Sequence, residues 1–236
     1  MIATQSNFER IDAGGGRHFD AYVSKPKVPN GRAVIVLQEI FGVTTAIREV
    51  ADRYAAEGYL AFAPDLYWRI TPGMELSHSK EDLARAFEAL AQFDEDAGVR
   101  DIGKTADHIR AQLGASTRVV VLGLCLGGKL AYLCAARLDV DAAVSFYGVG
   151  IEKNLDEIAA LACPLMLHFG ARDNYITPEV RATIAQAVAP AARASLHVYD
   201  EAGHGFYTRG DSPAKELAHA RTLAFLDDSC AVKEAQ

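Results

Sequence analysis

A glycine-rich run at residues 123–128 surrounds a cysteine in a pattern that can expose a nucleophile. The run reads Gly-Leu-Cys-Leu-Gly-Gly and follows the apolar segment 118–122, a predicted buried strand. The glycines would let a strand and a helix meet in a sharp turn with Cys125 at its apex. A thiol there lies at a helix N-terminus, where free backbone N–H groups favour a thiolate and a developing oxyanion. A packing turn around an ordinary buried cysteine is the alternative.

Two further residues could supply the base and its orienting group. Asp173 follows the predicted strand 165–169, and His204 follows the predicted strand 196–199. Because parallel strands end at one edge of a sheet, both side chains should meet Cys125 there. The chain order nucleophile, acid, histidine is that of α/β-hydrolases. The pattern predicts acyl transfer, in which Cys125 attacks, His204 moves the proton and Asp173 orients the imidazole.

The elements that must position these residues alternate along the chain. Predicted strands cover residues 19–24, 33–38, 59–63, 118–122, 142–146, 165–169 and 196–199. Predicted helices cover residues 44–57, 79–93, 97–113, 126–137, 155–161, 179–188 and 213–228. This alternation predicts an α/β fold with a mostly parallel central sheet flanked by helices on both faces. No repeat, linker or composition shift divides the chain, so we expect one domain over residues 1–236.

Composition narrows the function classes. Half of the 236 residues are hydrophobic and 23% are charged, as in a soluble globular protein. A net charge of −7 argues against a nucleic-acid partner. The four cysteines lack metal-ligand spacing and fit a reduced, cytoplasmic protein. Residues 1–10 do not resemble a signal peptide, and no apolar run is long enough for a membrane span, so we expect no membrane partner.

The sequence resembles the dienelactone hydrolase (carboxymethylenebutenolidase) family over residues 19–226. The matching stretches are Gln-Glu-Ile-Phe-Gly-Val at 38–43, Ala-Pro-Asp-Leu-Tyr at 63–67, the cysteine run at 123–128, Phe-Tyr-Gly-Val-Gly at 146–150 and Glu-Ala-Gly-His-Gly-Phe at 201–206. The resemblance implies an α/β-hydrolase fold. It also implies lactone hydrolysis through a Cys125 thioester, with neither a cofactor nor a metal.

The resemblance also assigns supporting residues. Glu39 would help to deprotonate the thiol when substrate arrives, and a buried carboxylate beside it would raise the pKa of the Cys125 thiol until then. The alternative for Glu39 is a polar residue at a strand end. The backbone N–H groups of Ile40 and Leu126 would form the oxyanion hole. The side chains that the resemblance places at the substrate are Phe41, Tyr147 and Phe206.

The pattern departs from the family where arginines bind a substrate carboxylate. Leu83 stands at the position of the family's helix arginine, with Arg85 two residues further on. Thr208 stands at the position of the second arginine, and Arg209 follows it. Two residues turn a helix by about 200°, so Arg85 should not simply replace the missing arginine. Arg85 and Arg209 remain candidate substrate-binding residues, with solvated surface charges as the alternative.

Three functions remain open from the sequence. The leading hypothesis is hydrolysis of dienelactone to maleylacetate, a step of (chloro)aromatic degradation. Phe87 and Leu90 make the pocket more apolar than is usual in the family, which favours a broad arylesterase that also accepts other activated esters, including phosphoesters. The third is a silent scaffold that binds a small hydrophobic ligand. The expected partner is a small lactone or ester, and the oligomeric state, monomer or small homo-oligomer, is left open.

Overall fold

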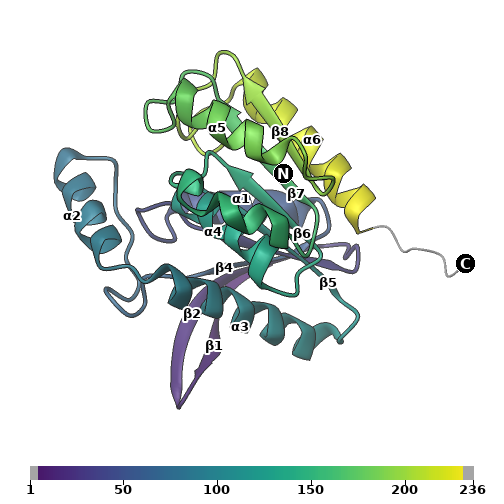
Figure 1. Cartoon of the computed structure of the whole chain (residues 1–236). Coiled ribbons are helices and arrows are strands. Elements are labelled where there is room, and N and C mark those ends of the chain that lie inside the picture. The colour runs from purple at the N-terminus through teal and green to yellow at the C-terminus, as the bar shows by residue number, and fades with distance from the viewer. Residues whose placement is uncertain (1–4, 231–236) are drawn as a thin grey trace, which may run out of the picture.

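The most apolar runs of the sequence form the middle of a sheet, because strands covered by helices on both faces must be hydrophobic throughout. The computed structural model describes residues 5–230, which form an eight-stranded sheet (Figure 1). The strands are β1 (Gln5–Gly14), β2 (Arg17–Lys25), β3 (Arg32–Leu37), β4 (Leu60–Pro64), β5 (Arg118–Leu124), β6 (Ala142–Phe146), β7 (Leu165–Gly170) and β8 (Ala194–Tyr199).

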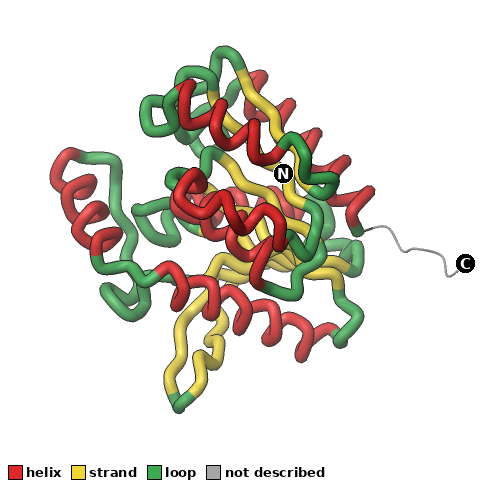
Figure 2. Tube along the Cα trace, in the orientation of Figure 1, coloured by secondary structure: helices red, strands yellow, loops and turns green. Residues whose placement is uncertain are grey.

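Helices separate most of these strands in the sequence (Figure 2). They are α1 (Thr45–Ala56), α2 (Lys80–Ala91), α3 (Glu95–Leu113), α4 (Leu126–Arg137), α5 (Pro178–Val188) and α6 (Pro213–Ser229), with the 3-10 helix η1 (Ile151–Ala160). The strand order is β1-β2-β4-β3-β5-β6-β7-β8. All pairs from β4 to β8 are parallel, whereas β1 and β2 are antiparallel at one edge. The predicted fold class is confirmed.

Two layers of helices enclose the sheet. Helices α1 and α6 cover one face, and α3, α4 and α5 cover the other (Figure 1). The central strand β5 is buried from Val119 to Leu124, and α4 beside it is buried over nearly its whole length. This burial fixes where β5 ends and α4 begins, and therefore where Cys125 lies.

The structure differs from the sequence-based expectation in two elements. Strand β1 was not predicted, because most of its residues are exposed and only Ile11 is fully buried, which leaves no alternating apolar pattern. The predicted helix at 155–161 is instead part of η1, a 3-10 segment broken at Asn154. The expectation of one domain over 1–236 stays a prediction, and residues 1–4 and 231–236 lie outside the described residues.

Within residues 5–230, none of the helices combines the length and the apolar character needed to cross a membrane.

Candidate active site

Cys125 has a strained backbone conformation at the turn from β5 to α4, where the glycines on either side let strand and helix approach closely. Cys125 has φ 54° and ψ −111°, and its backbone N–H donates to the carbonyl of Phe146 at 3.0 Å. A Cβ on Gly123 would lie 1.8 Å from the carbonyl oxygen of Gly127, and one on Gly127 would lie 2.5 Å from that of Leu37. The glycines are therefore required for strand and helix to approach, as the sequence predicts.

The Cys125 thiol lies in surroundings that favour its neutral form. Burial raises the pKa of the thiol, the negative charge of Glu39 raises it further, and a hydrogen bond from the Leu126 backbone N–H opposes this shift. Among the described residues, no hydrogen bond joins the thiol to the His204 ring. These surroundings therefore favour the neutral thiol over the thiolate.

His204 and Asp173 form the pair that the sequence predicts. His204 Nδ1 lies 2.8 Å from Asp173 Oδ2, and the Asp173 side chain is fully buried. The other carboxylate oxygen accepts backbone N–H groups from Tyr175 at 2.8 Å and Ile176 at 3.2 Å. The carboxylate is therefore held on both sides. The edges of two tyrosine rings, Tyr147 and Tyr175, pack on the imidazole at centroid distances of 4.9 and 4.7 Å.

Glu39 follows β3 and is only 3% exposed. Its Oε1 accepts a hydrogen bond from Thr208 Oγ1 at 3.3 Å, on the same loop as His204. The Tyr147 side chain is fully buried, and burial, with the negative charges of Glu39 and Cys125 as weaker causes, raises the pKa of its hydroxyl well above the ordinary value. Glu39 lines the same cavity as Cys125, and its negative charge raises the pKa of the thiol.

The N–H groups of Ile40 and Leu126 lie where an oxyanion hole is expected. Both residues line the same cavity as Cys125. Leu126 is the first residue of α4, so its N–H has no partner inside the helix. Among residues 5–230, neither N–H donates to a backbone carbonyl in a turn or loop. The Leu126 N–H instead donates to the Cys125 thiol, so both groups point to the part of the cavity where an oxyanion would need donors.

The reacting groups open into a cavity of about 440 Å³. One side is the α2 wall, formed by Leu83, Phe87 and Leu90. The remaining lining residues are Glu39, Ile40, Phe41, His78, Glu95, Cys125, Leu126, Lys129, Val149, Gly150, Lys153, Tyr175, His204 and Arg209. This cavity has the size of a small-ligand site, with an apolar wall on one side and the polar groups of Glu39, Cys125 and His204 on the other, the reacting edge.

Comparison with known proteins gives the same family as the motifs. The model of the "Dienelactone hydrolase family" matches residues 19–229. The chain belongs to this family. It is 40% identical over 222 residues to the carboxymethylenebutenolidase of Pseudomonas sp. (strain P51), covering 92% of each chain.

Solved structures agree with this assignment. A protein of Klebsiella pneumoniae subsp. pneumoniae, described as "Putative Dienelactone Hydrolase", shares 30% identity with a TM-score of 0.82, covering 94% of this chain and 98% of its own. A dienelactone hydrolase-like promiscuous phosphotriesterase from metagenomic libraries shares 18% identity with a TM-score of 0.78, over 96% and 98% of the two chains. The second likeness concerns the fold alone.

Not every side chain predicted at the substrate of this dienelactone hydrolase family member lies in the cavity. Phe41 and Arg209 line it. Arg85 does not: its side chain is 57% exposed and pairs with Asp82 at 2.9 Å. Tyr147 and Phe206 are buried behind the site, with ring centroids 5.5 Å apart. Their positions suit them to support His204 and Glu39 more than to contact substrate directly.

Several cavity residues were not predicted from the sequence. Lys129 is 8% exposed at its side chain, and its Nζ lies 2.6 Å from both carboxylate oxygens of Glu95. Its position one helical turn after Cys125 places it on the same face of α4, which is a signal that sequence spacing could have supplied. His78 packs on Phe41 at 4.4 Å between ring centroids, but nothing in the local sequence marks this contact.

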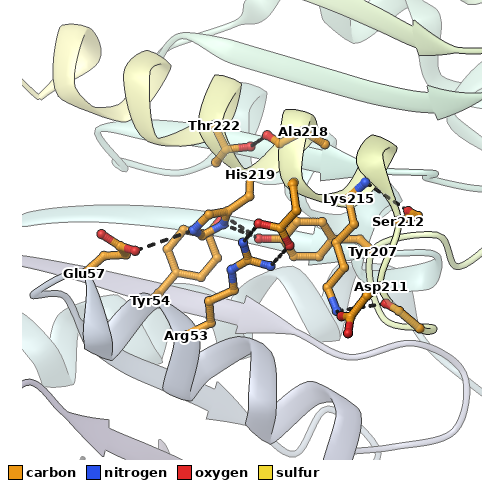
Figure 3. A network of polar contacts seen from close by, with 12 residues as sticks. Arg53, Tyr54, Glu57, Tyr207, Asp211, Ser212, Lys215, Ala218, His219 and Thr222 are labelled. Carbon is orange, nitrogen blue, oxygen red and sulfur yellow. Dashed lines mark hydrogen bonds and ion pairs between the residues drawn. The ribbon is translucent and has the colours of Figure 1, made fainter. Parts of the chain in front are cut away.

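A buried network behind the site anchors the His204 loop (Figure 3). The Tyr207 hydroxyl lies 2.7 Å from His219 Nδ1 on α6 and donates to the Tyr54 hydroxyl on α1 at 3.1 Å. On the exposed side, Arg53 pairs with Glu216 at 2.7 Å. Through Tyr207, three residues after His204, the loop therefore makes hydrogen bonds to α1 and α6, the two helices that cover this face of the sheet.

Within residues 5–230, the structure contains no group of three or more His, Cys, Asp or Glu side chains arranged to hold a metal ion.

Proposed function

We propose that this protein hydrolyses a lactone or ester by nucleophilic catalysis, with dienelactone as the leading substrate. Cys125 is the nucleophile, His204 the base and acid, and Asp173 the group that orients the imidazole. The observation that supports this most is that the strained Cys125 turn and the 2.8 Å His204–Asp173 contact occur at one sheet edge, where Ile40 and Leu126 line the same cavity. Names of relatives such as carboxymethylenebutenolidase support this choice of substrate.

The first half of the proposed reaction makes a thioester. Glu39 takes the proton from the Cys125 thiol, and the thiolate attacks the carbonyl carbon of the substrate. The oxygen of that carbonyl becomes negative and is stabilised by the N–H groups of Ile40 and Leu126. The carbon–oxygen bond of the ring then breaks, and the acyl group stays on Cys125. The leaving oxygen takes the proton that Glu39 removed from the thiol, which restores the Glu39 carboxylate.

In the second half, water replaces the thiol. His204 removes a proton from water, and its imidazolium is stabilised by the buried Asp173 carboxylate. The hydroxide attacks the thioester carbonyl and the carbon–sulfur bond breaks. The released thiolate takes the proton of the His204 imidazolium, which restores the thiol and the neutral imidazole. For dienelactone, the product would be maleylacetate.

A broad esterase is the second candidate, and the α2 wall favours it. Leu83, Phe87 and Leu90 present only apolar atoms where a carboxylated lactone would gain from a cation. The activity named for the promiscuous phosphotriesterase of the same fold is in line with this alternative. Such an enzyme would hydrolyse neutral activated esters as fast as dienelactone.

Steady-state kinetics on cis-dienelactone and p-nitrophenyl acetate separate these proposals. Cys125→Ala should lower kcat on both substrates to the background rate, a loss of at least about 10³-fold. Cys134→Ala is the matched control, because Cys134 is a buried packing residue of α4 outside the cavity, and it should keep wild-type kinetics. Full activity of Cys125→Ala contradicts the mechanism. If dienelactone turns over no faster than the simple ester, the broad esterase replaces the specific substrate.

A further inference from the structure

The Glu39 carboxylate is held by a neutral hydroxyl. Its oxygen accepts from Thr208 Oγ1 at 3.3 Å, and among residues 5–230 no Lys or Arg side chain forms an ion pair with it. A fixed cation would favour only the ionised carboxylate. A hydroxyl both donates and accepts, so it can serve the ionised and the protonated acid equally well.

Thr208 Oγ1 has three oxygen neighbours and a single proton. Besides Glu39, it lies 3.1 Å from the Gly205 carbonyl oxygen and 3.3 Å from the Tyr147 hydroxyl. A hydroxyl donates once and accepts twice. Burial raises the pKa of Tyr147 well above its ordinary value, so that hydroxyl keeps its proton and can donate to Thr208 or to Glu39. The single hydroxyl proton of Thr208 can therefore be donated either to Glu39 or to the Gly205 carbonyl, but not to both.

The protonation state of Glu39 determines which of these two acceptors the Thr208 hydroxyl uses. The Gly205 carbonyl already accepts the backbone N–H groups of Thr208 at 3.1 Å and Arg209 at 3.0 Å, so it does not need the hydroxyl. With Glu39 ionised, the Thr208 proton points to the carboxylate. With Glu39 protonated, the acid donates to Thr208 Oγ1, and the hydroxyl turns to Gly205. All three contacts of Oγ1 are then satisfied.

We infer that Thr208 is a positioning residue whose hydroxyl rotates between Glu39 and the Gly205 carbonyl, so that Glu39 can take the Cys125 proton at little cost. This inference rests on the proposed function, in which the thiol proton moves to Glu39. One proton leaves sulfur and binds a carboxylate oxygen, and the negative charge moves from Glu39 to the thiolate. Because Gly205 is adjacent to His204, the rotation occurs beside the base without moving the backbone.

Kinetics of Thr208 variants on p-nitrophenyl acetate test the inference. Thr208→Val keeps the shape of the side chain and removes the hydroxyl, so kcat should fall about 10-fold with KM changed less than about twofold. Thr208→Ser keeps the hydroxyl and should stay within about twofold of the wild type. Wild-type kcat in Thr208→Val, or an equal loss in Thr208→Ser, overturns the inference.

A second arm uses the Glu39→Gln background, where the side chain cannot take a proton. Adding Thr208→Val there should change kcat less than about twofold, since the hydroxyl then has no proton transfer to serve. An equal loss in both backgrounds means that Thr208 acts only through loop packing and overturns the inference. Thermal unfolding of each variant identifies any that fails to fold, and Thr208→Ala then replaces Thr208→Val. Failure of the proposed function is distinct, because Cys125→Ala would then remain active.

Discussion

The reacting edge of the cavity and its α2 wall are built in opposite ways. At the reacting edge, Cys125, Asp173 and His204 follow β5, β7 and β8. Backbone hydrogen bonds hold Cys125 and Asp173, and Asp173 holds His204. The α2 wall belongs to a helix that stands apart from the sheet (Figure 1), with only Ala86 and Ala89 buried. The proposed chemistry is therefore tied to the core of the fold, whereas the apolar wall of the cavity lies on an element that is less buried in that core.

The largest effect is expected at the reacting edge from Asp173→Asn. The amide has no negative charge to stabilise an imidazolium, and its NH2 group can donate to Nδ1 and favour the wrong tautomer, so kcat should fall by about 10³ to 10⁴-fold. Steady-state kinetics on p-nitrophenyl acetate measure the loss, with circular dichroism to verify folding. A decrease of less than tenfold would mean that His204 does not depend on this carboxylate.

A smaller effect is expected from Arg209→Ala on the recognition side of the cavity. Arg209 lines the cavity, whereas Arg85 points away and pairs with Asp82. Loss of Arg209 should raise KM for a carboxylated lactone by about 10-fold or more and leave KM for a neutral ester unchanged. Arg85→Ala is the matched control and should change neither value. Equal increases for both substrates would show that Arg209 does not bind the carboxylate.

The smallest effect concerns the network that anchors the His204 loop, and it appears in stability. Burial, with the charge of Arg53 as a weaker cause, lowers the pKa of His219 from 6.5 to about 4. As pH falls below 6.5, His219 becomes protonated in the unfolded chain but stays neutral in the folded protein. The free energy of unfolding should therefore decline from pH 6.5 to about 4. Burial also lowers the pKa of His168, which acts in the same direction.

Urea unfolding midpoints at pH 7.5 and 5.0 measure this decline. His219→Gln removes the titrating ring and should reduce the difference between the two midpoints, while the share due to His168 remains. An unchanged difference would mean that His219 does not contribute to it. Together with the two kinetic predictions, this result separates the chemistry of the reacting edge from the stability of its support.

The sequence predicted the reacting edge better than the cavity around it. Strong apolar runs located the parallel strands, and residues at their ends were expected to meet. The edge strand β1 was missed because its residues are mostly exposed. Arg85 is the other difference: it was a candidate substrate-binding residue, but in the structure it is exposed, pairs with Asp82 and does not line the cavity.

By itself, the sequence predicted the fold class, the family and the placement of Cys125, Asp173 and His204 after parallel strands, because backbone periodicity and glycine spacing act locally. Tertiary structure alone decided which side chains meet across elements. It placed Lys129 against Glu95, Thr208 against Glu39, and Tyr147 and Phe206 behind His204. Such contacts depend on rotamers and on the packing of elements far apart in the chain, which no local pattern contains.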